Sequence, residues 1–269
     1  MSTKCCNLEM GPITDICTAT RNLKDLKREI GFLTDEDTGR ERHDVYFVDE
    51  KVRTEMAAKS LEYLLAASQQ RTPGLSLSRR DRLYIAVTLA SSVLQLDGTF
   101  WLKRQWRSAD IVFLPTEEDP SLARPRMDYS HPYVTWRVLL NDTNTNLMSG
   151  VEDPAYPRQI RNESLFALGV TLIELSLKRN LSEMRIAEDG LLEVTANFNT
   201  ATRLIDDVYN ESGTRYGDVV QRCLTCPFNL QNLRDFGLDN EELQEAVFNH
   251  ILTPLRQDLE VFKGNQRFL

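Results

Sequence analysis

Apolar positions recur with a helical period over residues 78–98. The stripe is spaced by three or four positions and consists of Leu83, Ala86, Val87, Ala90, Val93 and Leu94. This spacing predicts a helix that buries one face. Ser78 can cap its first turn, with Asp81 three residues later completing a capping box. Asp97 and Gly98 then mark its end.

Residues 162–179 are apolar on nearly every side of a second predicted helix. The apolar positions are Leu165, Phe166, Leu168, Val170, Leu172, Ile173 and Leu175. A helix that is apolar all round must be surrounded by protein, so we expect this one at the centre of the domain. Asn162 is the predicted N-cap. Gly169 costs about 1 kcal/mol relative to Ala inside a helix, and we expect it to allow a close approach by another backbone.

The remaining pattern predicts a hairpin, a short strand and further helices. Two apolar runs, residues 30–33 and 45–48, flank a charged segment and predict a β-hairpin with a polar tip. Residues 111–114 suit a short buried strand, and residues 115–132 read as a solvated loop. Helices are expected over residues 8–26, 60–65, 214–224 and 239–262, the last with an Asp239–Glu242 capping box and a kink at Pro254.

Composition and charge limit the classes of protein to which the chain is expected to belong. The chain has 269 residues, 41% of them apolar, and a formal net charge of −8. The acidic balance disfavours nucleic-acid binding, which needs a cationic surface. No apolar run reaches the roughly 18 residues that a membrane span needs, and the N-terminus lacks the apolar core of a signal peptide. With only five cysteines, we expect a soluble cytoplasmic protein with free thiols.

The order of these elements resembles a protein kinase from the hinge onward. SLEYLL (residues 60–65) is followed by a long helix, a basic loop and a four-residue apolar strand. FALGVTLIEL (residues 166–175) is similar to the buried F-helix motif of kinases. YGDVVQRCLTCP (residues 216–227) is similar to a late kinase pattern of an apolar helix, Cys-Leu and Pro.

More narrowly, the chain resembles an uncharacterised kinase-like domain of filamentous fungi. The stretches that carry this likeness are ITDICTATRN, IGFLTDEDTGRERHDVYFV, LSRRDRLYIAVTLASSVLQL and TFWLKRQWRSADIVFL. Members often lie C-terminal to a helical domain of the heterokaryon-incompatibility, prion-inhibition (HeLo-like) type. The resemblance implies an α+β, mainly α fold: a truncated N-lobe over residues 1–74 (helix, β-hairpin and hinge helix), a helical C-lobe over residues 75–262, and a tail over residues 263–269.

The basic loop KRQWRSAD (residues 103–110) aligns without a gap on the kinase catalytic loop H-R-D-x-K-x-x-N. The Asp that takes the substrate's proton becomes Gln105, and an amide cannot accept that proton. The Lys that neutralises phosphate becomes Arg107, which keeps the charge. The metal-binding Asn becomes Asp110, still an oxygen ligand for a hard cation. Trp106 stands at an apolar position and is expected to pack in the core.

Other kinase parts are missing from the sequence. There is no G-x-G-x-x-G, and no V-A-I-K lysine precedes the hairpin. Asp128-Tyr129-Ser130 is a poor match to the metal-binding D-F-G, and Ser164 replaces the F-helix Asp that braces the catalytic loop. We therefore expect a catalytically inactive kinase-like module that binds a protein partner and needs no cofactor. The alternative is an atypical, Mg-ATP-dependent phosphotransferase that uses Asp110 and Asp128 for magnesium and Arg107 for phosphate. The sequence predicts no oligomeric state.

Smaller groups of cysteine, basic and histidine residues could have a functional or a structural role. Cys223-x-x-Cys226 is half of a zinc site or a half-buried helix end; the second cysteine pair that a zinc site needs is absent. Lys103, Arg104 and Arg107 either hold a phosphate or acidic partner, or form a solvated or salt-bridged loop. The three histidines, at positions 43, 131 and 250, show no nucleophile–base spacing and are expected to be structural.

Overall fold

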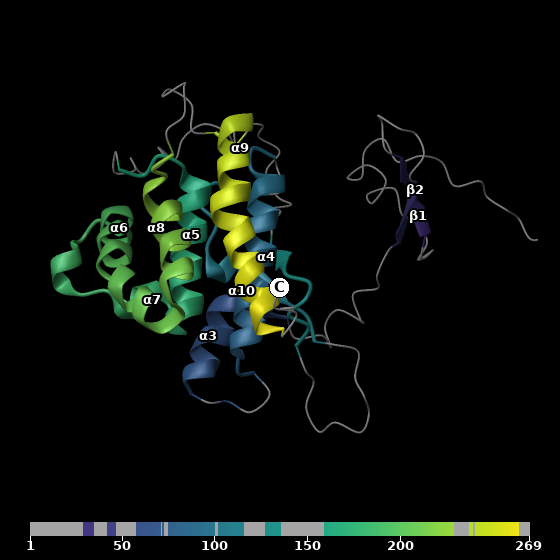
Figure 1. The fold of residues 1–269 in the computed structure, drawn as a ribbon. Coiled ribbons are helices and arrows are strands. Elements are labelled where there is room, and N and C mark those ends of the chain that lie inside the picture. Colours follow the sequence, from purple (N-terminus) through teal and green to yellow (C-terminus); the bar gives the residue numbers. More distant parts are fainter. Residues whose placement is uncertain are drawn as a thin grey trace, which may run out of the picture. The chain divides into compact units, whose positions relative to one another are not determined.

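The chain divides into two compact units, residues 1–57 and residues 58–269 (Figure 1). The computed structural model describes residues 29–34 and 42–46 in the first unit; in the second it describes residues 58–70, 72, 75–99, 102–115, 127–135, 159–228, 237–238 and 240–263. This division places residues 58–74 in the second unit, whereas the sequence-based division grouped them with the hairpin in residues 1–74.

The first unit contains the expected hairpin. Strand β1 (Glu29–Thr34) pairs with β2 (Arg42–Tyr46) in antiparallel register, with Phe32 opposite Asp44. The pairing is irregular between Glu29 and Gly31. The helix predicted over residues 8–26 lies outside the described residues.

The second unit is mainly helical and carries a small antiparallel sheet. The strands are β3 (Lys59–Ser60), β4 (Ile111–Phe113) and β5 (Tyr133–Val134), with β4 in the middle. Val112 lies opposite both Ser60 and Tyr133. An isolated bridge joins Pro115 to Met127. The sheet therefore confirms the strand predicted after the basic loop, and it brings the segment before α3 and the segment after Asp128 beside that loop.

Eight described α-helices make up the rest of this unit. They are α3 (Leu61–Gln69), α4 (Arg79–Leu96), α5 (Glu163–Leu177), α6 (Glu193–Arg203), α7 (Ile205–Ser212), α8 (Thr214–Thr225), α9 (Glu241–Val247) and α10 (Thr253–Phe262). Short 3-10 turns cover Ser108–Asp110, Leu181–Met184 and Ala187–Asp189. Helices α6 and α7 were not predicted, because their few apolar residues are separated by polar ones. None of the described helices is both long and apolar enough to cross a membrane.

The first two helices of this unit each begin at a serine whose hydroxyl caps the first turn. The Ser60 hydroxyl accepts a hydrogen bond from the Tyr63 amide and begins α3. At the start of α4, the Asp81 amide donates to the Ser78 hydroxyl at 3.1 Å, and the Ser78 amide donates to the Asp81 carboxylate at 3.0 Å. The predicted capping box is therefore confirmed. Gly98, with φ of +76°, follows the end of α4, as expected of a residue free to adopt positive φ.

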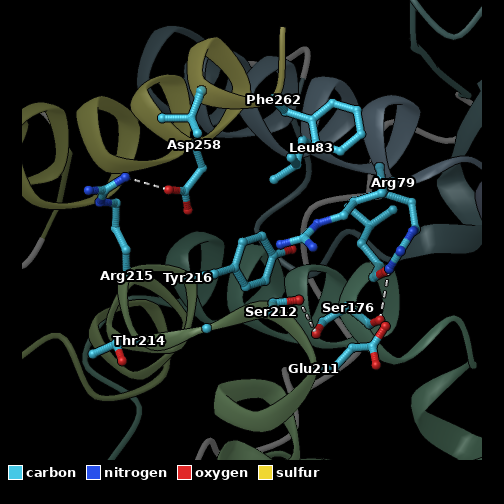
Figure 2. A pocket seen from close by; sticks show the side chains of 14 residues that line it. Arg79, Leu83, Ser176, Glu211, Ser212, Thr214, Arg215, Tyr216, Asp258 and Phe262 are labelled. Atoms are coloured by element: carbon cyan, nitrogen blue, oxygen red, sulfur yellow. Dashed lines mark hydrogen bonds and ion pairs between the residues drawn. The ribbon is translucent and has the colours of Figure 1, made fainter. Parts of the chain in front are cut away.

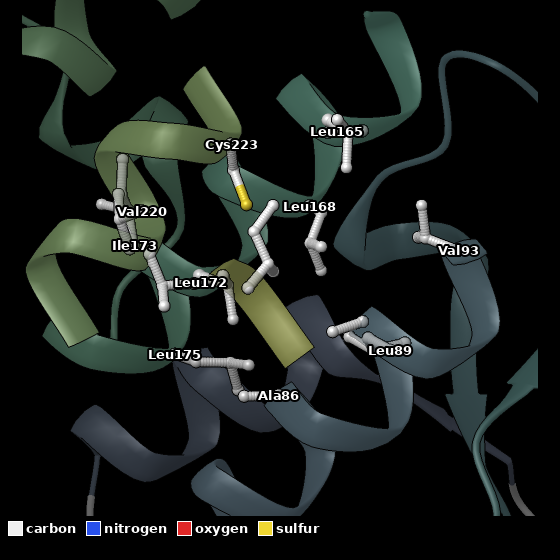
Figure 3. Close-up of a cluster of buried hydrophobic side chains, with 14 of the residues drawn as sticks. Ala86, Leu89, Val93, Leu165, Leu168, Leu172, Ile173, Leu175, Val220 and Cys223 are labelled. Carbon is white, nitrogen blue, oxygen red and sulfur yellow. The ribbon is translucent and has the colours of Figure 1, made fainter. Parts of the chain in front are cut away.

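Helix α5 is the central helix of the unit. Twelve of its fifteen residues are buried, and it contacts α4, α6, α7 and α8. Figure 3 shows Leu168, Leu172 and Leu175 of α5 among side chains from α4 and α8. The prediction of a helix covered on all sides is confirmed.

Both ends of α5 are closed by side chains. Asn162 accepts a hydrogen bond from the Leu165 amide at 2.7 Å and is the N-cap, as predicted. At the other end, Arg82 of α4 donates to the carbonyl oxygens of Leu175 and Ser176 at 2.7 and 2.9 Å. A cation at a helix C-terminus is favourable because the carbonyl groups there carry partial negative charge. Arg82 is only 8% exposed, so this contact ties α4 to α5 inside the core.

The C-terminal region is helical without a break from Glu241 to Phe262, in agreement with the helix predicted over residues 239–262, and it contains a π-helical segment that was not predicted. Asn240, which accepts from the Glu242 and Leu243 amides, caps α9; the predicted cap Asp239 lies outside the described residues. The helical ladder then widens into a π-helical segment, Phe248–Leu252, immediately before α10. Pro254 lies in the first turn of α10, where its missing N–H is tolerated. Helix α10 lies along α4 (Figure 1).

Gly169 lies against α8, where the atoms closest to its missing Cβ belong to side chains; the sequence had suggested a close approach by another backbone. A Cβ atom on Gly169 would stand 2.9 Å from Leu224 Cδ2 and 3.0 Å from Cys223 Cβ. Leu224 and Cys223 are each 1% exposed, so neither side chain has free space into which to move. The glycine therefore sets how closely the two helices approach.

We predict that Gly169→Ala lowers the free energy of unfolding by about 1–3 kcal/mol, because overpacking outweighs the better helix propensity of alanine. Urea denaturation measures this change. In a Leu224→Ala background, the same substitution should cost less, because the Leu224 atoms are gone and only the contact with Cys223 Cβ remains. A neutral or stabilising Gly169→Ala would show that the close approach is not a constraint.

Candidate functional site

The basic loop is held from inside by Trp106. This side chain is 2% exposed and belongs to the main hydrophobic core, as predicted. The loop continues into the 3-10 turn Ser108–Asp110 and then into β4. The Thr135 amide donates to the Asp110 carbonyl at 2.9 Å, which fixes the turn to the segment after β5. The loop is thus anchored on both sides.

The charged side chains of Lys103, Arg107 and Asp110 have partners within the loop or at the start of α6. Arg107 Nη1 lies 2.7 Å from Glu193 Oε1 at the start of α6, and both side chains are more than half exposed. The Asp110 carboxylate accepts the Arg107 amide at 3.0 Å and lies 3.8 Å from Lys103 Nζ. The structure therefore places the candidate phosphate ligand Arg107 in an ion pair and uses Asp110 to cap the turn.

Asp128 binds its own neighbours in sequence. Its carboxylate accepts from the Ser130 amide at 2.8 Å and from the Ser130 hydroxyl at 2.5 Å, and lies 2.8 Å from His131 Nδ1. The hydrogen bonds from Ser130 are the main cause of the lowered pKa of this carboxyl. Asp110 and Asp128 thus have different partners. Within the described part of the chain, no group of three or more His, Cys, Asp or Glu residues could hold a metal ion.

Ser164 does not contact the loop through its hydroxyl. The hydroxyl donates to the carboxylate of Asp97, at the end of α4. Asp97 also accepts from the Leu238 amide at 3.4 Å. At the position where the kinase pattern has a loop-bracing Asp, this chain therefore connects α5 to α4.

A cavity of about 650 Å³ lies beside the loop. We refer to it as the α5–loop cavity. Its walls come from residues 105–109 of the loop, the α5 face from Phe166 to Glu174, residues 180–182 and 185, and residues 192–195 and 197 at the start of α6. Glu62 of α3 also lines it. Gln105, at the position of the kinase base, lies partly buried in this wall.

Glu174 is the acidic residue of the buried α5 face. It is 5% exposed. One carboxylate oxygen, Oε1, accepts from the Leu181 amide at 2.8 Å, while Oε2 is buried with no hydrogen-bond partner. Burial raises the pKa of this carboxyl to about 7, against the opposing effect of hydrogen bonds from Leu181 and Ser108. Sequence reasoning missed Glu174, although an acid in the second half of an apolar helix is visible in the sequence.

Three more residues that line the same cavity have a buried polar atom without a hydrogen-bond partner. The atoms are Trp106 Nε1, Asn180 Oδ1 and Arg185 Nε. Trp106 and Asn180 are 2% and 7% exposed, and Arg185 also donates through Nη2 to Asn197 at 2.6 Å. A buried polar group left unpaired costs about 1–3 kcal/mol. Buried polar groups are usually paired with protein, water or a ligand, so this cavity is the strongest candidate for a binding site.

A second cavity, of about 540 Å³, lies between the first turns of α4 and α8 and the end of α10 (Figure 2). Many of its polar groups have partners within the chain. Arg215 lies 2.6 Å from Asp258, and the hydroxyls of Ser176 and Ser212 are 2.7 Å apart. The Tyr216 hydroxyl donates to the Leu172 carbonyl at 2.9 Å. These contacts join α8 to α5 and α10, although Arg82, which also lines this cavity, has Nε buried without a partner.

The two late cysteines are buried thiols at the end of α8. Cys223 and Cys226 are each 1% exposed, and burial raises the pKa of both. Their environment is apolar and fits the interpretation as a helix end. The other three cysteines lie outside the described residues. His250 stacks on Phe228, with ring centroids 6.1 Å apart.

A family model described as a domain of unknown function, DUF7580, matches residues 2–262. No curated protein and no solved structure matches the chain. The comparisons therefore give a family, and they give no activity, ligand or partner.

We predict that Glu174→Gln raises the free energy of unfolding above neutral pH. The folded-state pKa of about 7 exceeds the ordinary value of 4.5. Between these values the folded state binds more protons than the unfolded chain, so Glu174 lowers the stability as pH rises. The variant should be more stable than the wild type by up to about 3 kcal/mol near pH 8, with little difference near pH 4.5.

Urea denaturation across this pH range measures the effect. Glu193→Gln is the matched control, because the Glu193 side chain is 57% exposed and should add no such pH dependence. Parallel stability–pH curves for the wild type and Glu174→Gln would contradict the prediction.

Proposed function

The chain belongs to the DUF7580 family, a domain family of unknown function, and we propose that its helical unit is a catalytically inactive, kinase-like module that binds a protein partner. The sequence resemblance supports a regulatory role in fungal signalling or allorecognition, beside a helical effector domain. The order of elements also supports the kinase-like part. Helix α3, the long helix α4, the basic loop, strand β4, the buried helix α5 and helix α8 follow one another as in the second lobe of a kinase.

The observation that carries the proposal is the chemistry of the loop. Phosphoryl transfer depends on positioned groups: a base for the hydroxyl, cations for phosphate and carboxylates for magnesium. Gln105 stands at the base position and offers an amide, which cannot take the proton. Arg107 is paired with Glu193, and Asp110 caps its own turn. The side chains that phosphate transfer would use have structural partners instead.

A protein partner is the favoured ligand because the unit offers a cavity with exposed apolar residues beside it. Leu191 and Leu192 are 100% and 76% exposed, and Leu192 lines the α5–loop cavity. Large exposed apolar residues beside a cavity are typical of binding surfaces.

The phosphotransferase alternative retains one specific observation. Arg107 and Asp110 are neighbours, joined by the hydrogen bond from the Arg107 amide. The ion pair with Glu193 is solvent-exposed and worth at most about 1 kcal/mol, so phosphate could displace Glu193. Asp128, however, is turned toward Ser130 and His131.

We predict that millimolar Mg-ATP shifts the thermal unfolding midpoint of the full chain by less than about 1 °C, because a ligand that does not bind the folded state cannot stabilise it. Differential scanning fluorimetry measures the shift. Asp110→Ala removes both carboxylate oxygens, including the one that accepts the Arg107 amide. Asp206→Ala, on an exposed position of α7, is the matched control.

A shift of several degrees that is lost in Asp110→Ala and kept in Asp206→Ala would favour the phosphotransferase. So would transfer of labelled phosphate from ATP to a generic protein substrate with the same dependence on Asp110. Either result would contradict an inactive module.

A further inference from the structure

The second cavity, of about 540 Å³, is called the α4–α8 cavity below, and it has more cations than carboxylates in its wall. Its charged lining residues are Arg79, Arg82, Arg215, Glu211 and Asp258. Both carboxylates have a cationic partner within the chain: Asp258 lies 2.6 Å from Arg215, and Glu211 lies 3.3 Å from Lys178. No carboxylate of the described residues pairs with Arg79. The wall therefore has a positive charge that the chain does not neutralise.

Arg79 stands at an electrostatically unfavourable position. It is the first residue of α4, where the backbone amides carry partial positive charge, so a cation there lowers the stability of the helix. It also repels a second cation of the same wall: burial is the main cause of the lowered pKa of the Arg82 guanidinium, and the charge of Arg79 adds to it. An anionic group bound beside Arg79 would reduce both repulsions. The charges of the cavity thus favour an acidic ligand.

The same cavity has an apolar part. Leu83 of α4 and Val261 and Phe262 at the end of α10 line it (Figure 2). Val261 and Phe262 are 46% and 47% exposed, and exposed apolar side chains beside a cavity are typical of binding surfaces. An inorganic anion would leave these side chains in contact with water. A peptide with an acidic residue next to a bulky apolar residue would pair with the cation and cover them.

We propose that the α4–α8 cavity binds a segment of a partner protein in which an Asp or Glu lies next to a bulky apolar residue. The carboxylate pairs with Arg79, and the apolar side chain packs against Val261 and Phe262. This inference rests on the proposed protein-binding function and names the chemistry of one contact with the partner. An anionic membrane surface fits the cavity worse, because Glu211 and Asp258 line it and the chain has a net charge of −8.

The test selects a displayed library of random nine-residue peptides against the full chain at low salt. Selected peptides should be enriched in Asp or Glu next to Phe, Leu, Ile or Val. Replacing the acidic residue of a selected peptide by its amide should weaken binding about three- to tenfold in fluorescence polarisation. Raising the salt concentration from about 0.05 M to about 0.5 M should also weaken binding, since salt screens exposed charges.

Two arginine variants of the chain separate binding at the cavity from a general effect of charge. Arg79→Gln removes the cation that lines the cavity and should weaken binding about three- to tenfold. Its thermal unfolding midpoint should stay the same or rise, because a cation at the start of α4 is unfavourable; a merely structural role of Arg79 would require the midpoint to fall. Arg80→Gln is the matched control: Arg80 is the next residue of the same helix, is exposed and does not line the cavity, so binding should be unchanged.

Two phenylalanine variants locate the apolar contact. Phe262→Ala should weaken binding about tenfold, because the apolar side chain of the peptide loses the surface that it covers. Phe248→Ala is the matched control: Phe248 is 44% exposed, lies in the π-helical segment before α10 and does not line the cavity, so binding should be unchanged.

Binding that survives Arg79→Gln, or that Arg80→Gln weakens equally, would overturn the proposal. So would the selection of no peptide above background, selected peptides without an acidic residue, or an equal loss of binding in Phe248→Ala and Phe262→Ala. Inorganic phosphate that binds as tightly as the peptides, or phosphatidylserine vesicles that bind with the same dependence on Arg79, would assign the cavity to a free anion or to a membrane surface instead. Phosphate transfer that depends on Asp110 would contradict the inactive module and leave the peptide measurements unchanged, so the two failures are distinguishable.

Discussion

The fold of the helical unit depends on burying a helix that has almost no polar side. Helix α5 is stable only because α4, α6, α7 and α8 cover it. Its two ends would otherwise leave unpaired amides and carbonyls in the core. Asn162 pairs with the first turn, and Arg82 pairs with the last carbonyls. A buried α5 needs both apolar neighbours along its sides and hydrogen-bond partners at its ends. Without those partners, the unpaired backbone groups would offset part of the free energy gained from burial.

This requirement explains why Glu174 differs from the other polar residues of α5. Thr171 donates back to the Ala167 carbonyl, Ser164 donates to Asp97, and Ser176 pairs with Ser212. Each of these groups is paired within the chain. Glu174 Oε2 has no hydrogen-bond partner, and three other residues that line the α5–loop cavity also have a buried atom without one. Buried atoms without partners also occur in Arg82, Tyr129 and Glu163, which do not line this cavity, so the cavity is distinguished by having four such residues together.

The sequence predicted elements that depend on local patterns. The capping box at Ser78, the N-cap Asn162, the burial of α5 and the close approach at Gly169 all follow from residue type and spacing. Helices α6 and α7 were missed because their stability comes from packing, with Ala196, Ala201 and Val208 as small buried residues among polar ones. The cavity could not be predicted, because it joins Trp106, Glu174 and Arg185, which are far apart in sequence. The loop residues were found by alignment, but their partners, such as Glu193 for Arg107, required the structure.

The contacts of the loop residues differ in how strongly they hold the loop in place. The exposed ion pair between Arg107 and Glu193 contributes at most about 1 kcal/mol, as does a typical surface pair, so it cannot by itself hold the loop. Trp106 can, because burying a large aromatic side chain contributes several times more than such a pair. Trp106 stands at a position that is apolar in the kinase pattern as well, so its burial fixes the loop without deciding its chemistry. The loop anchored in this way forms one wall of the α5–loop cavity.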